Sequence, residues 1–111
     1  MRQLLHFLFF SFSLFIHAQE IAILKYNGGG DWYSNPTALP NLIAFTNNNS
    51  NTNIAKNPTT VAAGNSAIFN FPIVFLTGHG NVYFSEDEVQ NLRNYLISGG
   101  FLHISDNYGL D

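Results

Sequence analysis

The sequence predicts an α/β fold in which a parallel sheet is flanked by helices, Rossmann-like or flavodoxin-like in the broad sense. The run FPIVFLT (71–77) is apolar at nearly every position, as expected of an interior strand that is covered on both faces. A helix pattern starts soon after it, at Ser85, and a further strand pattern, FLHIS (101–105), follows. Strand–helix–strand units at such short intervals give parallel neighbours through a right-handed crossover.

The first half of the domain contains a strand, a long loop and a short helix. EIAILKY (20–26) is an isoleucine-rich apolar run that predicts a buried first strand. NGGGDWYSNPT (27–37) is a glycine-rich loop. LPNLIAFTN (39–47) predicts a short helix, because Pro40 falls where a first turn tolerates proline.

The middle of the chain gives weaker signals. NNNSNTN (47–53) is polar and of low complexity, which predicts a mobile surface loop. A brief second strand is expected around Val61. DNYGLD (106–111), at the other end of the domain, is expected to be a loop after the last strand.

The start of the second helix carries the strongest local signal. Ser85 and Glu88 have the spacing of a capping box, and Phe84 with Val89 can form a hydrophobic staple. Gly99-Gly100 is expected to end the helix. The positions expected to form its buried stripe are Val89, Leu92, Tyr95 and Leu96.

Composition excludes several classes of function. The chain has 111 residues, enough for one small domain, and is 46% hydrophobic and 10% charged. A net charge of −3 argues against a nucleic-acid-binding protein, which normally presents a basic face. The chain has no cysteine, so disulfides, thiolate catalysis and cysteine-type zinc sites are excluded. We expect no cofactor.

Residues 1–18 are expected to be a secretory signal peptide. Arg2 precedes an apolar run from Leu4 to Ile16, and Ala18 is a small residue suited to the position before cleavage. The apolar run is shorter than the roughly 20 residues of a membrane span. An uncleaved N-terminal anchor is the alternative. The domain at 19–111 is therefore expected to be exported, periplasmic or extracellular, with contact to a membrane only through this segment.

The polar residues gather where a ligand site is expected. In open α/β sheets, ligands bind beyond the carboxyl ends of the strands, and three polar loops should emerge there, at 27–36, 77–85 and 106–111. The candidate ligand-binding residues in them are Gly29, Gly30, Asp31, Trp32, Tyr33, Asn35, Gly78, His79, Gly80, Asn81, Asp106 and Asn107. His79 and Asp106 are also candidate catalytic residues.

Each candidate in the first loop also has a structural interpretation. The glycines at 28–30 could form a flexible turn, and neither the GxGxxG nor the GxxxxGK[ST] spacing of a phosphate site is present. Asp31 could cap a local turn or contact a ligand. Trp32 and Tyr33 could pack in the core or line a pocket.

The two later loops leave similar alternatives. His79 could hold a turn or serve as a polar contact or acid–base group, and the glycine on each side favours a close backbone approach. Asp106 could cap a following helix or bind a ligand. His103 alternates with strand residues and is expected to be structural. Asp31, His79 and Asp106 do not show a metal-ligand spacing, and we expect no metal site.

Three segments resemble a known family. YNGGGDWYSNPTALPNL, LTGHGNVYFSEDEVQNLRNYLISGGFL and DNYGLD are similar to the uncharacterised bacterial family domain of unknown function 4159, over roughly 20–111. The resemblance implies a class I glutamine amidotransferase-like fold and an exported or membrane-associated protein. It also implies a full length about twice that of this chain, so we expect a fragment that is incomplete at its C-terminus.

The resemblance also places the catalytic elements of that wider fold. TGHGN (77–81) would take the place of the oxyanion-hole loop, and the nucleophile elbow would fall near Ser105-Asp106-Asn107, where no cysteine is present. We therefore expect a non-catalytic binding module of the cell envelope, whose partner is a small molecule or an envelope protein. The alternatives are an exported hydrolase that uses His79 and Asp106 with residues beyond the fragment, and an assembly module with Trp32 and Tyr33 in an exposed apolar patch.

Overall fold

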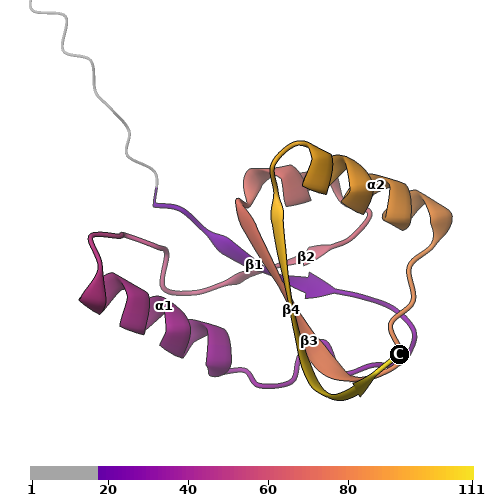
Figure 1. The fold of residues 1–111 in the computed structure, drawn as a ribbon, viewed down its shortest axis with the longest axis horizontal. Coiled ribbons are helices and arrows are strands. Elements are labelled where there is room, and N and C mark those ends of the chain that lie inside the picture. Colours follow the sequence, from indigo (N-terminus) through magenta and orange to yellow (C-terminus); the bar gives the residue numbers. More distant parts are fainter. Residues whose placement is uncertain (1–17) are drawn as a thin grey trace, which may run out of the picture.

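The computed structural model describes residues 18–111. Its strands form one parallel sheet in the order β2-β1-β3-β4, with helices on both faces (Figure 1). The elements are β1 (Ile21–Lys25), α1 (Ala38–Asn49), β2 (Thr59–Ala62), the short 3-10 helix η1 (Ser66–Asn70), β3 (Ile73–Gly80), α2 (Glu86–Ile97) and β4 (Phe101–Leu110). The predicted α/β class is confirmed. In flavodoxin-like sheets, too, the first strand lies between the second and third.

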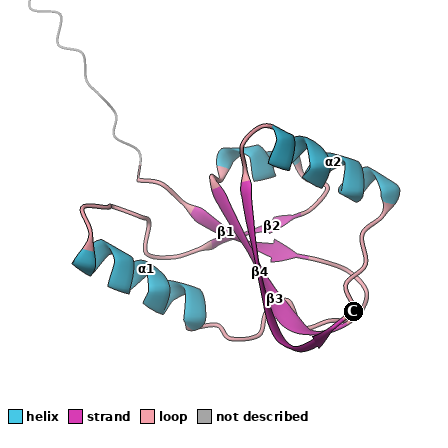
Figure 2. Ribbon diagram, in the orientation of Figure 1, coloured by secondary structure: helices cyan, strands magenta, loops and turns pink. Residues whose placement is uncertain are grey.

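The sheet separates two apolar cores. Alternate residues of a strand point to opposite faces, so Ala22 and Leu24 enter one core while Ile21 enters the other. The larger core lies between the sheet and the layer formed by η1 and α2, to which Leu92 and Tyr95 contribute (Figure 2). The smaller core lies under α1, which contributes Leu39 and Ile43.

The capping box at the start of α2 is confirmed. Ser85 Oγ accepts a hydrogen bond of 3.3 Å from the amide of Glu88, and the Glu88 carboxylate accepts one of 2.8 Å from the amide of Ser85. Leu92 and Tyr95 are buried as predicted, but Val89 and Leu96 are 44% and 46% exposed. These two side chains instead line an open apolar groove between α2 and β4.

The polar segment at 47–53 was assigned wrongly in part, because its first three residues continue α1. The side chain of Asn47 explains this. Its amide donates a hydrogen bond of 2.8 Å to the carbonyl of Ile54, and its oxygen accepts one of 2.9 Å from the amide of Ile54. These bonds fix the end of α1 to the segment that leads to β2.

The later strands are longer than predicted. β3 runs on to Gly80, so His79 lies at the end of a strand, and β4 runs on through the expected loop to Leu110. Pairing with β3 explains the extension: Gly78 lies opposite Asp106, and Gly80 opposite Leu110, with a register shift between them. The additional residues of β4 form an irregularity there instead of a free loop.

The predicted signal peptide falls on residues that lie outside the described part of the chain, apart from Ala18. Between residues 18 and 111, no helix is long and apolar enough to cross a membrane.

Candidate functional site

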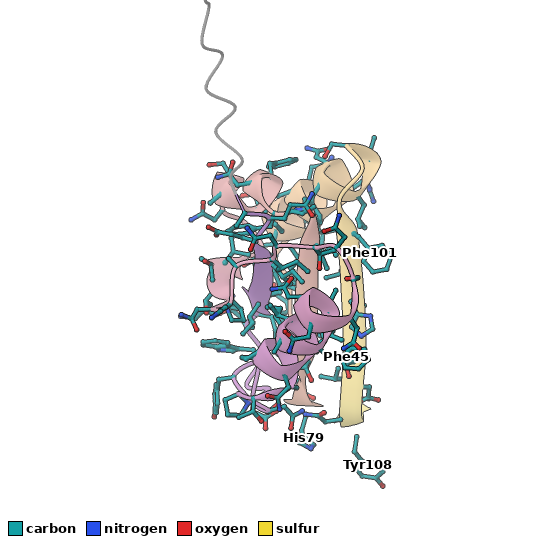
Figure 3. The ribbon with its side chains drawn as sticks, turned by 90° about the vertical axis from the view of Figure 1, so that its left-hand side faces the viewer. Phe45, His79, Phe101 and Tyr108 are labelled. Carbon is teal, nitrogen blue, oxygen red and sulfur yellow. The ribbon has the colours of Figure 1, made fainter. Side chains whose placement is uncertain are left out.

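The candidate site lies at the carboxyl ends of β1 and β3. The chain leaves β1 toward β2 on one side and leaves β3 toward β4 on the other, which makes the gap between β1 and β3 the switch point of the sheet. Open α/β sheets bind their ligands at such a point. Figure 3 shows His79 and Tyr108 at this end of the sheet, with side chains that point away from it.

Asp31 and His79 form a pair across the switch point. The carboxylate of Asp31 accepts a hydrogen bond from the amide of His79, and its second oxygen lies 3.0 Å from His79 Nδ1. The amide of Asp31 in turn donates to the carbonyl of His79 at 3.1 Å. The loop after β1 is thus bonded to the end of β3 through both backbone and side chains.

The pair is open to solvent and electrostatically matched. The side chains are 51% exposed for His79 and 32% for Asp31. The amide of His79 lowers the pKa of Asp31, partial burial opposes this, and the imidazole lowers it further. Asp31 is therefore an anion, which favours the tautomer of a neutral His79 that carries its proton on Nδ1 and has Nε2 as an acceptor.

Close packing explains the glycines of this region. Gly78 has φ +147°, and a Cβ placed on it would overlap the hydroxyl of Tyr26 and come within 3.0 Å of Asp31 Oδ1. A Cβ on Gly30 would lie 2.7 Å from the carbonyl oxygen of Asn81. The glycine before His79 is thus needed for the close backbone approach that the sequence indicated.

A cavity of about 320 Å³ lies on the α1 side of the sheet, and its lining includes Trp32 and Thr77, which are close in sequence to the pair. We call it the Trp32 cavity. Ile23, Phe75 and Thr77 line it from the strands, and the loop at 32–36 and Pro58 close it from the other side. Among the residues that the structure describes, no charged side chain lines it.

The cavity wall contains an unusual polar group. Thr77 is 3% exposed, and its hydroxyl oxygen has no hydrogen-bond partner among the described residues. Trp32 is held in the wall by Lys25, whose Nζ lies 5.6 Å from the ring centroid, and by an edge-on contact with Tyr33.

A larger depression of about 690 Å³, next to Gln19 and Pro72, lies near the amino ends of the strands. Open α/β sheets bind their ligands at the opposite, carboxyl ends.

The comparisons with known proteins identify the family. Residues 20–111 match the family model described as Domain of unknown function (DUF4159). The chain belongs to the DUF4159 family. A comparison with curated proteins finds no match.

Most of the residues proposed from the sequence for this DUF4159 protein do meet at one end of the sheet. Gly30 and Asp31 are bonded to Asn81 and His79, next to Gly78. Trp32, Tyr33 and Asn35 line the cavity. Gly29 is the exception, since it is exposed and a Cβ placed on it would contact nothing within 4 Å.

The last strand of the DUF4159 domain contributes in a different way from the prediction. Asn107 accepts a hydrogen bond of 2.6 Å from the side chain of Asn35 and donates one of 3.0 Å to Ser34 Oγ. Asp106 does not begin a helix; its carboxylate accepts the amides of Tyr108 and Leu110 at 2.9 and 3.1 Å. Asn107 therefore connects the loop at 32–36 to β4 by hydrogen bonds, whereas, among the described residues, the carboxylate of Asp106 bonds only to amides of its own strand.

Two features of the DUF4159 site were not predicted. His79 and Asp106 were proposed together as candidate catalytic residues, but among the described residues His79 is paired with Asp31 and shows no hydrogen bond to Asp106. Thr77 was not proposed at all, although a hydroxyl at the end of an apolar strand is a signal.

His103 is exposed, and its ring stacks on that of Phe75 with the ring centroids 5.3 Å apart. Within residues 18–111, no three acidic, histidine or cysteine side chains converge as metal ligands would.

The assembly alternative named a patch that includes Trp32 and Tyr33. Tyr33 is 67% exposed, but Trp32 is partly buried against the larger core. Exposed aromatic side chains also occur elsewhere, as Phe45 on α1 and Phe101 on β4 show (Figure 3).

Proposed function

We propose that this DUF4159 protein is a non-catalytic, glutamine amidotransferase-like binding domain of the cell envelope, and that it binds a small ligand at the Asp31–His79 pair. The observation that carries the proposal is the pair itself: a half-exposed imidazole oriented by a carboxylate at the switch point of an open α/β sheet. It presents an outward-facing hydrogen-bonding group at a fixed position.

The surroundings support binding over acyl transfer. The chain has no cysteine, and β4 continues through Ser105 and Asp106 as a strand paired with β3. The carboxylate of Asp106 is used by backbone amides of its own strand. The described residues therefore supply an oriented polar contact without a nucleophile beside it. Export to the envelope, as the N-terminal segment suggests, would make the ligand a molecule of that compartment.

The test measures which small molecules the protein retains. The purified chain is incubated with a small-molecule extract of bacterial envelopes and washed, and the retained compounds are identified by mass spectrometry. We expect one compound to be retained by the wild type and lost at least about tenfold in His79→Ala and Asp31→Asn, because each variant removes a partner of a charge-assisted bond. His103→Ala, an exposed histidine away from the pair, is the matched control and should retain it. Equal retention by all variants would refute the proposal.

A second candidate is an exported hydrolase, and one observation favours it. Donation of Nδ1–H to Asp31 leaves Nε2 of His79 as an acceptor, which is how a histidine general base is arranged. In this version, Asp31 is the carboxylate that orients His79. Hydrolysis of p-nitrophenyl acetate above the buffer rate, lost in His79→Ala and retained in His103→Ala, would favour the hydrolase; identical rates with and without protein would count against it.

A further inference from the structure

The hydroxyl of Thr77 is the starting point. Its side chain lines the Trp32 cavity, it is 3% exposed, and its oxygen has no partner among residues 18–111. Buried hydroxyls in folded proteins are nearly always hydrogen-bonded, and the exceptions call for a specific explanation. Because Thr77 lines the cavity, a molecule seated there is the nearest candidate for the missing partner.

The shape of the cavity limits what that molecule can be. Its volume of about 320 Å³ is near the lower end of ligand pockets, which span roughly 300–1,000 Å³. An apolar protein cavity of roughly 150 Å³ is already large enough for benzene. The occupant is therefore a small molecule or one end of a larger one.

The walls limit its chemistry. Trp32 and Phe75 are aromatic, and Pro36 and Pro58 add rigid apolar surface. Among residues 18–111, no lysine, arginine, aspartate, glutamate or histidine lines the volume, so a charged group there would be desolvated without compensation. Tyr33 and Asn57 also line it, and Ser34 and Asn35 are bonded to Asn107, whereas the buried hydroxyl of Thr77 has no partner among the described residues. Such a wall is suited to a neutral ring that carries a hydrogen-bonding group for Thr77.

The position of the cavity connects it to the strand-end pair. Thr77 precedes His79 by two residues in β3, and Trp32 directly follows Asp31. Asn107 of β4 is bonded to Asn35 and Ser34, which belong to the cavity wall. The cavity wall and the Asp31–His79 pair are therefore formed by the same two segments of the chain.

We propose that the Trp32 cavity is the specificity pocket of the strand-end site, that it takes the neutral, ring-bearing end of the ligand, and that Thr77 Oγ1 hydrogen-bonds the polar group on that ring. This inference rests on the proposed function, because it assumes that the same ligand also reaches the Asp31–His79 pair. It adds the class of ligand: a small molecule with an uncharged aromatic or alicyclic ring bearing a hydroxyl or carbonyl.

The test uses two simple probes of similar shape, phenol and toluene, with the full chain. Trp32 is the only tryptophan of the sequence, so its fluorescence and its indole N–H resonance report on this wall directly. We expect saturable binding of both probes, with phenol preferred by roughly fivefold or more, because one buried hydroxyl gains a partner. Thr77→Val keeps the shape and should reduce the preference to about one, whereas Thr60→Val on the exposed strand β2 should leave it intact.

Two results would overturn the inference: no saturable change at Trp32 with either probe, or a phenol preference that persists in Thr77→Val. The inference and the proposed function fail separately. Retention of an envelope compound that depends on His79, without phenol binding, overturns the cavity assignment alone. A Thr77-dependent preference for phenol, with retention unaffected by His79→Ala, supports the cavity and overturns the role of the pair.

Discussion

The hydroxyl of Tyr26 donates a hydrogen bond of 3.0 Å to the carbonyl oxygen of Thr77, and this bond joins the end of β1 to the end of β3 directly beside the Asp31–His79 pair. Tyr26 is buried, and both its burial and the charge of Asp31 raise its pKa, so the phenol keeps its proton and remains a donor. The geometry of the site thus depends on a neutral buried contact beneath it.

Gly78 lies between these groups, and its substitution should be costly. Gly78→Ala would place a methyl group against Tyr26 and Asp31 at a positive φ, and we expect a loss of about 2–5 kcal/mol in the free energy of unfolding. Gly29→Ala is the matched control: its φ is +94°, but no atom lies within 4 Å, so only backbone strain of about 1–2 kcal/mol applies. Urea unfolding of the two variants measures the difference. Equal losses would show that the contact with Tyr26 is unimportant.

Because of Asp31, the free energy of unfolding should fall as the solution becomes acidic. Its pKa in the folded protein is lowered, so its stabilising contribution is fully present above its ordinary pKa of about 4 and disappears as the pH falls through the lower folded pKa. Asp31→Asn should therefore flatten the stability profile below about pH 4. The main cause is the backbone amide of His79, so His79→Ala should keep most of the effect. Unfolding profiles from neutral pH downward provide the test; a His79→Ala profile as flat as that of Asp31→Asn would contradict this order of causes.

Replacing Thr77 with valine should stabilise the unliganded protein. Thr77→Val removes a buried hydroxyl that has no partner among the described residues and keeps the shape, so we expect the free energy of unfolding of the unliganded protein to rise by about 1 kcal/mol. Thr77→Ser keeps the hydroxyl and removes a buried methyl group, which should lower it by about 1 kcal/mol. Thermal unfolding distinguishes these signs. A destabilised Thr77→Val would mean that the hydroxyl already has a partner, such as a bound water.

The capping box should contribute measurably to α2. Ser85→Ala removes the acceptor for the amide of Glu88, and a loss of about 1 kcal/mol is expected. Gln90→Ala on the exposed face of the same helix should change stability by less than about 0.5 kcal/mol. Chemical denaturation of both variants is sufficient, and a Ser85→Ala protein as stable as Gln90→Ala would show that the cap is dispensable.

The sequence predicted those features that depend on neighbours along the chain. Ser85 and Glu88 are three residues apart, so their mutual bonds follow from local geometry. The apolar runs at 20–26 and 71–77 contain β1 and the first part of β3, as expected. The location of the candidate site beyond the carboxyl ends of the strands followed from the predicted parallel α/β class. Most candidate residues lie at the carboxyl end of the sheet, where the sequence predicted them.

Contacts between segments that are far apart in the chain could not be predicted from local sequence patterns. Asp31 and His79 are separated by 48 positions, and the pairing of β1 with β3 brings them together. Local turn signals at 106–110 were outweighed by pairing with β3, which kept the segment in the sheet. The exposure of Val89 and Leu96 depends on where α2 lies over the sheet, which a helical period does not specify.

The strand order has a consequence for the timing of synthesis. β1 is made first, yet it lies between β2 and β3, so its second edge stays unpaired until β3 has been translated. At roughly 5–20 residues per second, the 48 positions from Asp31 to His79 take about 2–10 s to add. During that interval one edge of β1 in the nascent chain lacks its partner strand. The Asp31–His79 pair can therefore form only after β3 has been added to the chain.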